Sequence, residues 1–305
     1  MTVTDPRPLP GARFLDPATL SRIDNLELLA RTVVEGFLNG LHHSPYLGLS
    51  VDFAEHRAYM PGDDIRRIDW RLWARTDRFY LKEFEADTNA NFSVILDISR
   101  SMDFATGRLT KFDYGRYLAA CLTWFSRKQR DRVGLVTFDT QMRDRIPPSA
   151  KNLNVILHTL DQLKPGEPGV LRAPLLKIAE TFHRRSILTL ISDFYEEPPA
   201  VIEAVNLLRT KGNDLIVFQV LDPAELDFPF PDPANFEDLE SGQRIPLEPD
   251  HLRERYREAI RAHTRELERL CGENQIDYAL FNTATPLDYA LFHFLSRRER
   301  MARVK

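Results

Sequence analysis

Cysteines, long apolar runs and targeting signals are scarce or absent in this chain of 305 residues. The two cysteines, Cys121 and Cys271, lie far apart and near no other cysteine or histidine, so we interpret them as core residues of a reduced, cytosolic protein. No apolar run approaches the length needed to cross a bilayer. Residues 1–17 lack the basic start and the apolar stretch of a secretory signal. We therefore expect a cytoplasmic protein without a membrane segment.

Neither sign of charge dominates the composition. The chain has 41 lysines and arginines against 45 aspartates and glutamates, a formal net charge of −4. This balance does not attract nucleic acid or anionic lipid to the molecule as a whole. A group of basic residues between positions 66 and 82 is interleaved with acids, and such a cluster is usually a solvated or paired face. We therefore expect no nucleic-acid partner.

Signatures of catalysis are mostly missing as well. The sequence has no glycine-rich phosphate loop and no serine nucleophile elbow. Its eight histidines are scattered and show no metal-ligand spacing. Asp97 followed by Ser99 resembles phosphotransferases that place an aspartate after a strand, but those generally need a second acid two positions on. The sequence therefore predicts a protein that is not an enzyme.

What the chain does contain is an alternation of apolar strands and helices after Asn89. This pattern predicts a mainly parallel sheet covered by helices on both faces. An amphipathic helix is predicted upstream, because apolar residues recur at helical spacing from Ile23 up to about Gly40. The predicted strands are Phe79–Phe84, Phe92–Leu96, Val133–Phe138, Met142–Ile146, Ser186–Ile191, Leu215–Val220 and Tyr278–Phe281, and the later helices are Phe112–Phe125, Leu153–Leu163, Leu175–Phe182, Val201–Leu208 and Arg253–Leu270.

Composition divides the chain into three parts. Residues 1–15 are predicted to be a flexible arm, and residues 16–88 an N-terminal segment that is first helical and then irregular. Residues 89–305 are predicted to form the α/β domain. Residues 223–250 within it are rich in proline and acids and are predicted to be an insertion. In that insertion, Phe236–Leu239 and Arg244–Leu247 flank a turn and predict a hairpin.

The most informative feature is the end of one predicted strand. The run Asn91–Leu96 leads directly into Asp97-Ile98-Ser99-Arg100-Ser101, which offers one carboxylate and two hydroxyls from a tight loop. Hard oxygen donors placed in this way suit Mg²⁺, which keeps several waters and takes few protein ligands. Asp193 follows another apolar strand, and the carboxyl ends of such strands meet at one crevice. The predicted metal site is Asp97, Ser99, Ser101 and Asp193.

A plainer interpretation of the same loop stays open. Short polar side chains such as Asp97 and Ser99 often cap the next helix and bond local backbone groups. The second aspartate at the end of a central strand favours a site with metal-binding ancestry. Whether an ion is actually bound is left undecided by the sequence.

A second motif, Tyr59-Met60-Pro61-Gly62-Asp63-Asp64-Ile65-Arg66-Arg67-Ile68-Asp69-Trp70, lies in the N-terminal segment. One interpretation is a structural knot, in which its acids pair with its arginines while its tryptophan packs on the sheet domain. The other is a docking surface, where tryptophan and arginine are typical hot spots. The residues concerned are Asp63, Asp64, Arg66, Asp69 and Trp70.

These motifs together carry a resemblance. The Asp-x-Ser-x-Ser loop, the strand Val133–Phe138 and the strand end Ile191-Ser192-Asp193 resemble a von Willebrand factor A-type domain. With the Pro-Gly-Asp-Asp motif, the chain resembles the bacterial domain-of-unknown-function family number fifty-eight over nearly its whole length after Asp16. The other motifs that support this resemblance are Ala74-Arg75-Thr76, Asp222-Pro223-x-Glu225, Glu240-Ser241-Gly242, Arg255-Tyr256 and Thr285-Pro286-Leu287.

The resemblance implies a von Willebrand factor A-like, Rossmann-like α/β fold. It implies no established chemistry, but genes of this family commonly lie beside those of MoxR-type AAA+ ATPases, which suggests a chaperone-adaptor or assembly role. In von Willebrand A-type domains, an Asp-Ser-Ser loop, a threonine from a second loop and an aspartate from a third hold Mg²⁺, and an acidic group of the partner completes the metal's shell. By motif, Asp97, Ser99, Ser101 and Asp193 match this set.

The threonine does not match. The expected second loop places Gly169, or else Pro168, at its position, and neither supplies a side-chain oxygen. Glu167 is a conceivable substitute, but a carboxylate would change the charge of the site and could repel an acidic partner.

The expected function is therefore a non-catalytic adaptor that works with a MoxR-type ATPase through a face resembling a metal-ion-dependent adhesion site. Two alternatives remain open. One is a Mg²⁺-dependent hydrolase or phosphotransferase that uses the same crevice, and the other is a scaffold with a relict metal site.

Overall fold

A computed structural model describes most of the chain. The described residues are 25–42, 56–58, 73, 75–76, 78–82, 90–209, 212–232, 234–237, 244–247 and 249–291. The predicted arm, residues 1–15, lies outside them. So does the predicted motif of Asp63, Asp64, Arg66, Asp69 and Trp70.

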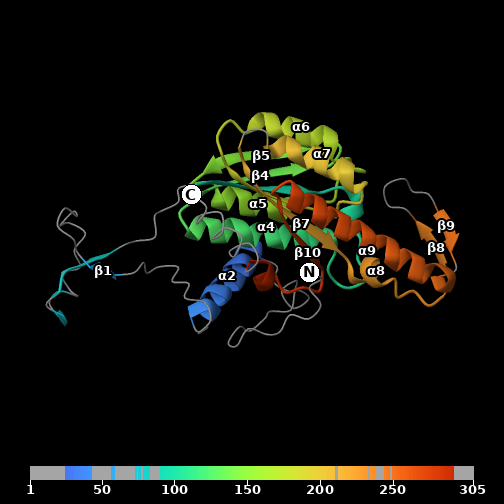
Figure 1. Ribbon diagram of the computed structural model, residues 1–305, viewed down its shortest axis with the longest axis horizontal. Helices are drawn as coiled ribbons and strands as arrows, with labels where there is room; N and C mark the ends of the chain where they lie inside the picture. The colour runs from blue at the N-terminus through green and yellow to red at the C-terminus, as the bar shows by residue number, and fades with distance from the viewer. Residues whose placement is uncertain are drawn as a thin grey trace.

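A six-stranded sheet forms the centre of the molecule, in the strand order β10-β7-β6-β3-β4-β5 (Figure 1). Five strands are parallel, and β5 pairs antiparallel with β4 at one edge. This confirms the predicted mainly parallel sheet, and the predicted strand at Met142–Ile146 forms its antiparallel edge. The strands are β3 (Asn91–Asp97), β4 (Arg132–Phe138), β5 (Met142–Ser149), β6 (Ile187–Ser192), β7 (Asp214–Leu221) and β10 (Asp277–Asn282).

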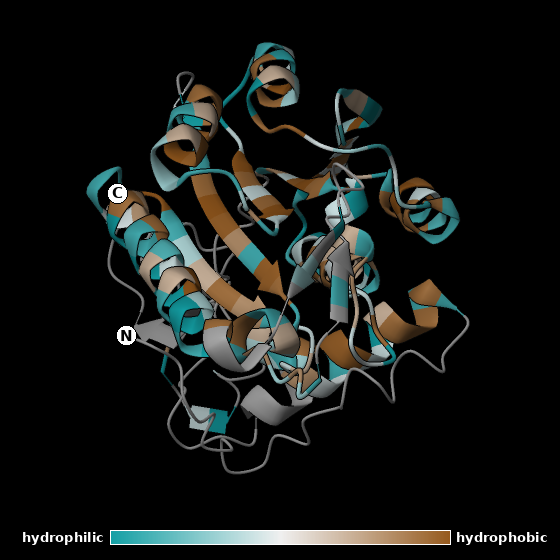
Figure 2. Cartoon of the chain, turned by 90° about the vertical axis from the view of Figure 1, so that its right-hand side faces the viewer, coloured by the Kyte–Doolittle hydropathy of each residue, from teal (hydrophilic) through white to brown (hydrophobic). Residues whose placement is uncertain are grey.

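Helices cover both faces of this sheet. In the view of Figure 1, α6 and α7 lie above the strands, while α4 and α5 lie below them. Figure 2 shows the strands as largely hydrophobic and the helices as divided into apolar and polar sides. The helices are α2 (Leu26–His42), α4 (Lys111–Lys128), α5 (Leu153–Gln162), α6 (Arg172–Thr181), α7 (Pro198–Arg209), α8 (Pro223–Asp227) and α9 (Pro249–Glu273).

Alternate residues of β3 enter two separate hydrophobic clusters. Phe92, Val94 and Leu96 belong to the cluster that includes α2, α4 and α5, whereas Ile95 belongs to the cluster under α6, α7 and α9. Such alternation follows from the two-residue period of a strand. A strand that is apolar on both faces is therefore fixed in position from both sides.

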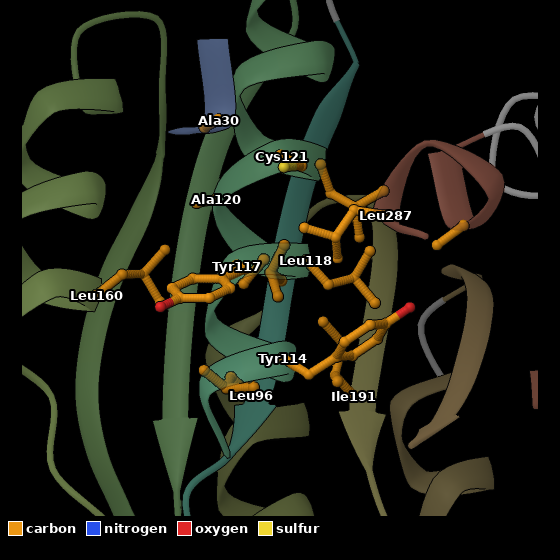
Figure 3. Packing of buried hydrophobic residues seen from close by; sticks show 14 of the residues in the cluster. Ala30, Leu96, Tyr114, Tyr117, Leu118, Ala120, Cys121, Leu160, Ile191 and Leu287 are labelled. Atoms are coloured by element: carbon orange, nitrogen blue, oxygen red, sulfur yellow. The ribbon is translucent and has the colours of Figure 1, made fainter. Parts of the chain in front are cut away.

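Helix α4 supplies much of the first cluster. Figure 3 shows Tyr117 of this helix pointing toward Leu160 of α5, with Leu118 and Cys121 on the side of Leu287. Both Cys121 and Cys271 are free and buried, so they are core residues as predicted.

The N-terminal helix α2 is part of this core. It ends at His42, close to the predicted end at Gly40, and the amide oxygen of Asn25 accepts the N–H of Leu28 at 2.9 Å across its first turn. Phe37 meets Phe125 of α4 edge to face, with ring centroids 6.1 Å apart. Farther along, β1 (His56–Ala58) pairs antiparallel with β2 (Tyr80–Lys82), which lies within the predicted strand Phe79–Phe84.

The predicted hairpin is present, and its first strand begins two residues earlier than expected. Strand β8 (Ala234–Glu237) pairs antiparallel with β9 (Arg244–Leu247). The segment that leads to it begins with the short helix α8, which the sequence did not predict. In the described part of the chain, no helix is both long enough and apolar enough to span a membrane.

Candidate functional site

The strand order places the predicted site residues at a switch point of the sheet. From β3 the chain moves to β4 on one side, and it later returns to β6 on the other side. Crevices at the carboxyl ends of strands that diverge in this way are the usual ligand sites of open α/β sheets. Leu96 of β3 lies opposite Ile191 of β6, so the next residues, Asp97 and Ser192, are neighbours.

Asp97 is bonded on both of its carboxylate oxygens. Oδ1 accepts the backbone N–H of Ser99 at 2.9 Å, and Oδ2 accepts the hydroxyl of Ser192 at 2.6 Å. The carboxyl group is buried, and Asp193 lies nearby. Burial, and then the charge of Asp193, raise the pKa of Asp97 to about 7, although the hydrogen bonds from Ser192 and Ser99 act in the opposite direction.

The two loop hydroxyls lie side by side. The Oγ atoms of Ser99 and Ser101 are 3.2 Å apart. Ser99 stands at the N-cap of the 3₁₀ turn Arg100–Asp103, but its side chain makes no capping hydrogen bond there. The plainer interpretation thus holds for Asp97, which does bond local backbone, and fails for Ser99.

Asp193 reaches the same edge from the end of β6. The Nζ of Lys111 lies 2.8 Å from its Oδ2, and the backbone carbonyl of Asp193 accepts the side-chain amide of Gln219 at 2.7 Å. The next residue, Phe194, is buried with a positive φ of 52°, which is a strained conformation for a bulky side chain. His263 bonds the Phe194 carbonyl at 2.8 Å, so the backbone that follows the Asp193 side chain is held by two hydrogen bonds.

Lys111 contacts a second acid as well. Its Nζ lies 2.8 Å from Oε1 of Glu225, on the short helix α8. Burial alone would lower the pKa of Lys111, but the carboxylates of Asp193 and Glu225 raise it above its usual value. The lysine is therefore a buried cation shared between two carboxylates.

Glu225 is held by a capping box. Its other carboxylate oxygen accepts the backbone N–H of Asp222 at 2.7 Å, and Asp222 in turn accepts the N–H of Ala224 at 2.8 Å. Asp222 also accepts the backbone N–H of Thr106 at 3.0 Å. The Asp222-Pro223-x-Glu225 motif therefore joins the loop after β3 to the segment after β7.

Gly169 lies directly against the site loop. A Cβ atom built on Gly169 would be 2.5 Å from the Cβ of Ser99, closer than real Cβ contacts come. The loop is fastened in this position by Gly166 N–H to the carbonyl of Ile98 at 2.6 Å and by Arg100 N–H to the carbonyl of Glu167 at 3.2 Å. A threonine therefore does not fit at residue 169 without a shift of this loop. The side chain of Glu167, the alternative ligand considered above, is exposed.

The two serine hydroxyls are spaced as two ligands of one Mg²⁺ ion would be. An octahedral Mg²⁺ with bonds of about 2.1 Å places adjacent oxygens about 3.0 Å apart, close to the Ser99–Ser101 separation of 3.2 Å. The carboxylates of Asp97 and Asp193 would balance the charge, and water would fill the position that Gly169 leaves. Among the described residues, no group of three or more His, Cys, Asp and Glu side chains is placed to hold a metal, so an ion here depends on the hydroxyls. We call Asp97, Ser99, Ser101 and Asp193 the Asp97 site.

Sequence reasoning missed Lys111 as a member of this neighbourhood. A lysine in the first turn of an amphipathic helix is typical of an exposed position, and no local pattern distinguishes this one. Glu225 did carry a signal, because it belongs to the Asp222-Pro223-x-Glu225 motif that supports the family resemblance.

Comparison with known sequences gives one family match. Residues 55–266 match the family described as "Protein of unknown function DUF58". The uncharacterized protein Rv1480 of Mycobacterium tuberculosis and the uncharacterized protein Mb1516 of Mycobacterium bovis are each 27% identical to this chain over 272 residues, which cover 84% of the chain and 83% of the relative.

Comparison with solved structures gives more distant likenesses. The conserved hypothetical protein BatB from Bacteroides thetaiotaomicron has a TM-score of 0.49 and 15% identity, over 69% of this chain and 99% of that one. The SpRpn10 VWA domain has a TM-score of 0.40 and 11% identity, over 66% and 94%. The mixed sheet of six mostly parallel strands flanked by helices confirms the predicted α/β fold.

Proposed function

The chain belongs to the DUF58 family of proteins of unknown function, and we propose that it is a protein–protein interaction module. The docking surface would be centred on the Asp97 site. A von Willebrand factor A-like fold is compatible with such a role.

The observation that carries this proposal is the combination of polar and apolar groups at one edge of the sheet. The buried carboxylates of Asp97 and Asp193 lie there, beside two side chains that remain exposed. Val170 follows Gly169 on the loop against Ser99 and is 51% exposed, and Tyr195 follows two residues after Asp193 and is 45% exposed. Apolar and aromatic groups around a polar centre are typical of protein interfaces.

We propose a MoxR-type AAA+ ATPase as the partner and the cytoplasm as the place of the interaction. The partner follows from the family resemblance, in which the two kinds of gene are commonly neighbours. The reduced, buried state of Cys121 and Cys271 suits a reducing compartment.

We also propose that the Asp97 site can hold Mg²⁺. Ser99 and Ser101 would be its hydroxyl ligands, and Asp97 and Asp193 would orient its waters or bind it directly. The ion would supply a centre of positive charge that an acidic group of the partner can approach. The hydrogen bond from Gly166 to Ile98 fixes the loop beside the site, and the contact of Gly169 with Ser99 leaves no room for a third hydroxyl ligand. The pairing of β3 with β6 brings the carboxylates of Asp97 and Asp193 together.

The proposal is tested by capture of the ATPase on immobilised protein, with wild type compared with Asp97→Ala and Asp193→Ala. We expect both variants to lose at least about ten-fold in affinity, which corresponds to about 1.4 kcal/mol. Glu180→Ala, at an exposed position near the far end of α6, is the matched control and should bind as wild type does. Unchanged binding by both site variants would remove this face from the mechanism.

The proposed role is non-catalytic, and that part is tested separately. Purified protein is incubated with phosphoester substrates in the presence of Mg²⁺. Turnover that disappears in Asp97→Asn would support the hydrolase or phosphotransferase alternative instead.

A further inference from the structure

Lys111 occupies a position that is unfavourable for a lysine in two ways. Its side chain is completely buried, and it is the first residue of α4, where the helix dipole is positive. Either feature alone disfavours an ammonium group. The groups around Lys111 must therefore compensate the positive charge of its ammonium group.

That compensation comes from residues far away in the sequence. The ammonium lies 2.8 Å from Asp193 at the end of β6 and 2.8 Å from Glu225 on α8. The ring of Tyr195 covers it at 4.7 Å and the ring of Phe104 lies at 5.9 Å, so water is kept away from the cation. The Lys111 ammonium thus forms ion pairs with Asp193 and Glu225, and Asp193 belongs to the Asp97 site.

We propose that Lys111 is the resident cation of the Asp97 site: a positioning residue that holds the Asp193 carboxylate in place without metal and sets how tightly the site binds a divalent ion. This inference rests on the proposed metal-binding capacity of the site. It assigns a role to a residue that is itself no metal ligand.

Electrostatics gives the direction of the effect. An ammonium on Oδ2 of Asp193 uses one acceptor position of that carboxylate and repels any cation bound beside it. A divalent ion that binds Asp193 must therefore share the carboxylate with Lys111 or displace the ammonium toward Glu225. Wild-type affinity for Mg²⁺ is weakened in both cases.

Glu225 makes the displacement possible. Because Lys111 already bonds Glu225, the ammonium keeps a charged partner when the Asp193 carboxylate binds a divalent ion instead. Glu225 is anchored by the capping box of α8, so it stays in place during such an exchange.

The experiment measures binding of Mg²⁺ and Mn²⁺ to the full chain by calorimetry. Lys111→Met keeps the length of the side chain and removes its charge, so we expect at least about ten-fold tighter binding than in wild type. Lys111→Arg keeps the charge and should stay within about three-fold of wild type, since a guanidinium also repels the ion. Equal or weaker binding by Lys111→Met would overturn the proposal.

A double variant distinguishes the effect of the Lys111–Asp193 contact from the effect of net charge on ion affinity. It also tests the proposal if Lys111→Met alone fails to fold. Lys111→Met with Glu225→Gln removes one charge of each sign, so the net charge of the neighbourhood equals that of wild type. We expect it to bind Mg²⁺ more tightly than wild type, because Asp193 is released from the ammonium. Identical affinities of the double variant and wild type would contradict the assignment.

Failure of this inference is distinguishable from failure of the proposed function. Capture of the ATPase in EDTA reports the docking surface without any ion. Capture that is lost in Asp193→Ala while the ion affinity of Lys111→Met equals that of wild type would keep the docking surface and remove the role of Lys111.

Discussion

Two aspartates at the ends of neighbouring strands differ in what surrounds them. Asp97 is the last residue of β3 and Asp139 directly follows β4, and both are buried. Asp139 accepts the Nε–H of Arg143 on both oxygens, at 2.8 and 2.7 Å, and the N–H of Gln141 and of Glu167 at 3.2 Å each. Asp97 accepts one backbone N–H and one hydroxyl, and no ion pair joins it to a cation within the described residues.

The pKa values of the two carboxyl groups reflect this difference. Burial acts to raise the pKa of Asp139, but Arg143 and the backbone N–H groups outweigh it and hold that pKa below its usual value. For Asp97, burial and the charge of Asp193 outweigh the hydrogen bonds from Ser192 and Ser99, and the pKa rises to about 7. A carboxylate whose charge is fully compensated belongs to the framework, whereas one that lacks a counter-charge is available to a ligand.

The largest effect is expected from Asp139→Ala. This change removes the acceptor of the Glu167 N–H and of the Arg143 guanidinium. Loop 163–171 then loses its hydrogen bond to the residue that follows β4. We expect the free energy of unfolding to fall by about 2–4 kcal/mol, measured by urea denaturation. Asp161→Ala, at an exposed position on α5, should change it by less than about 0.5 kcal/mol. A loss below about 1 kcal/mol for Asp139→Ala would contradict the framework role.

A somewhat smaller effect is expected where the loop meets the Asp97 site. Gly169→Ala places a methyl group 2.5 Å from the Cβ of Ser99 and should cost about 1–3 kcal/mol through overpacking. Gly107→Ala is the matched control, because nothing lies within 4 Å of a Cβ added there. The two variants are compared by thermal and urea unfolding, and equal stability would show that the loop can move freely.

The pH dependence of stability should also separate the two aspartates. The folded pKa of Asp97 is raised from 3.8 to about 7, so the folded state binds the extra proton and stability falls as the pH rises from about 4 to about 7. Asp97→Asn should reduce this decline and be about 1–2 kcal/mol more stable than wild type at pH 8. Urea titrations at several pH values measure the difference, and parallel curves for the two proteins would refute it.

Asp139 should behave in the opposite way. Its folded pKa is lowered, so its contribution is present above the unfolded value of 3.8 and is lost as the pH falls through the folded pKa. Asp139→Asn should therefore flatten only the acid limb of the stability curve.

The smallest expected effect is that of Mg²⁺ on wild type. While Lys111 is paired with Asp193, we expect Mg²⁺ to raise the free energy of unfolding by less than about 1 kcal/mol. This holds at Mg²⁺ concentrations a few times the dissociation constant. Thermal unfolding with and without Mg²⁺ measures it, and Asp97→Ala should abolish it. A shift that survives in Asp97→Ala would place the ion elsewhere.

The sequence was sufficient to predict the framework of the site. The apolar runs that end at Asp97 and Asp193 predicted two buried strands, and the carboxyl ends of parallel strands have to meet at one edge. The hairpin at β8 and β9 was predicted because two short segments flank the turn Glu240-Ser241-Gly242-Gln243. These signals are local, so they can be recognised without the rest of the fold.

The charge balance around the site could not be predicted, because it is made over long distances in the chain. Lys111 pairs with acids 82 and 114 residues away. Periodicity treats a lysine as a surface residue, and only the folded strand ends show that this one is buried. Helix α8 was missed for another reason: its proline and acids suggested an irregular insertion, whereas they form a first-turn proline and a capping box.

The close contact between Gly169 and Ser99 restricts how this site can be redesigned. A single exchange at residue 169 cannot add a third hydroxyl ligand, because the loop would first have to move away from β3. That movement breaks the Gly166–Ile98 and Glu167–Asp139 hydrogen bonds, so a three-hydroxyl site requires a rebuilt loop. A designer who wants a tighter ion site in this scaffold should therefore begin at Lys111 rather than at Gly169.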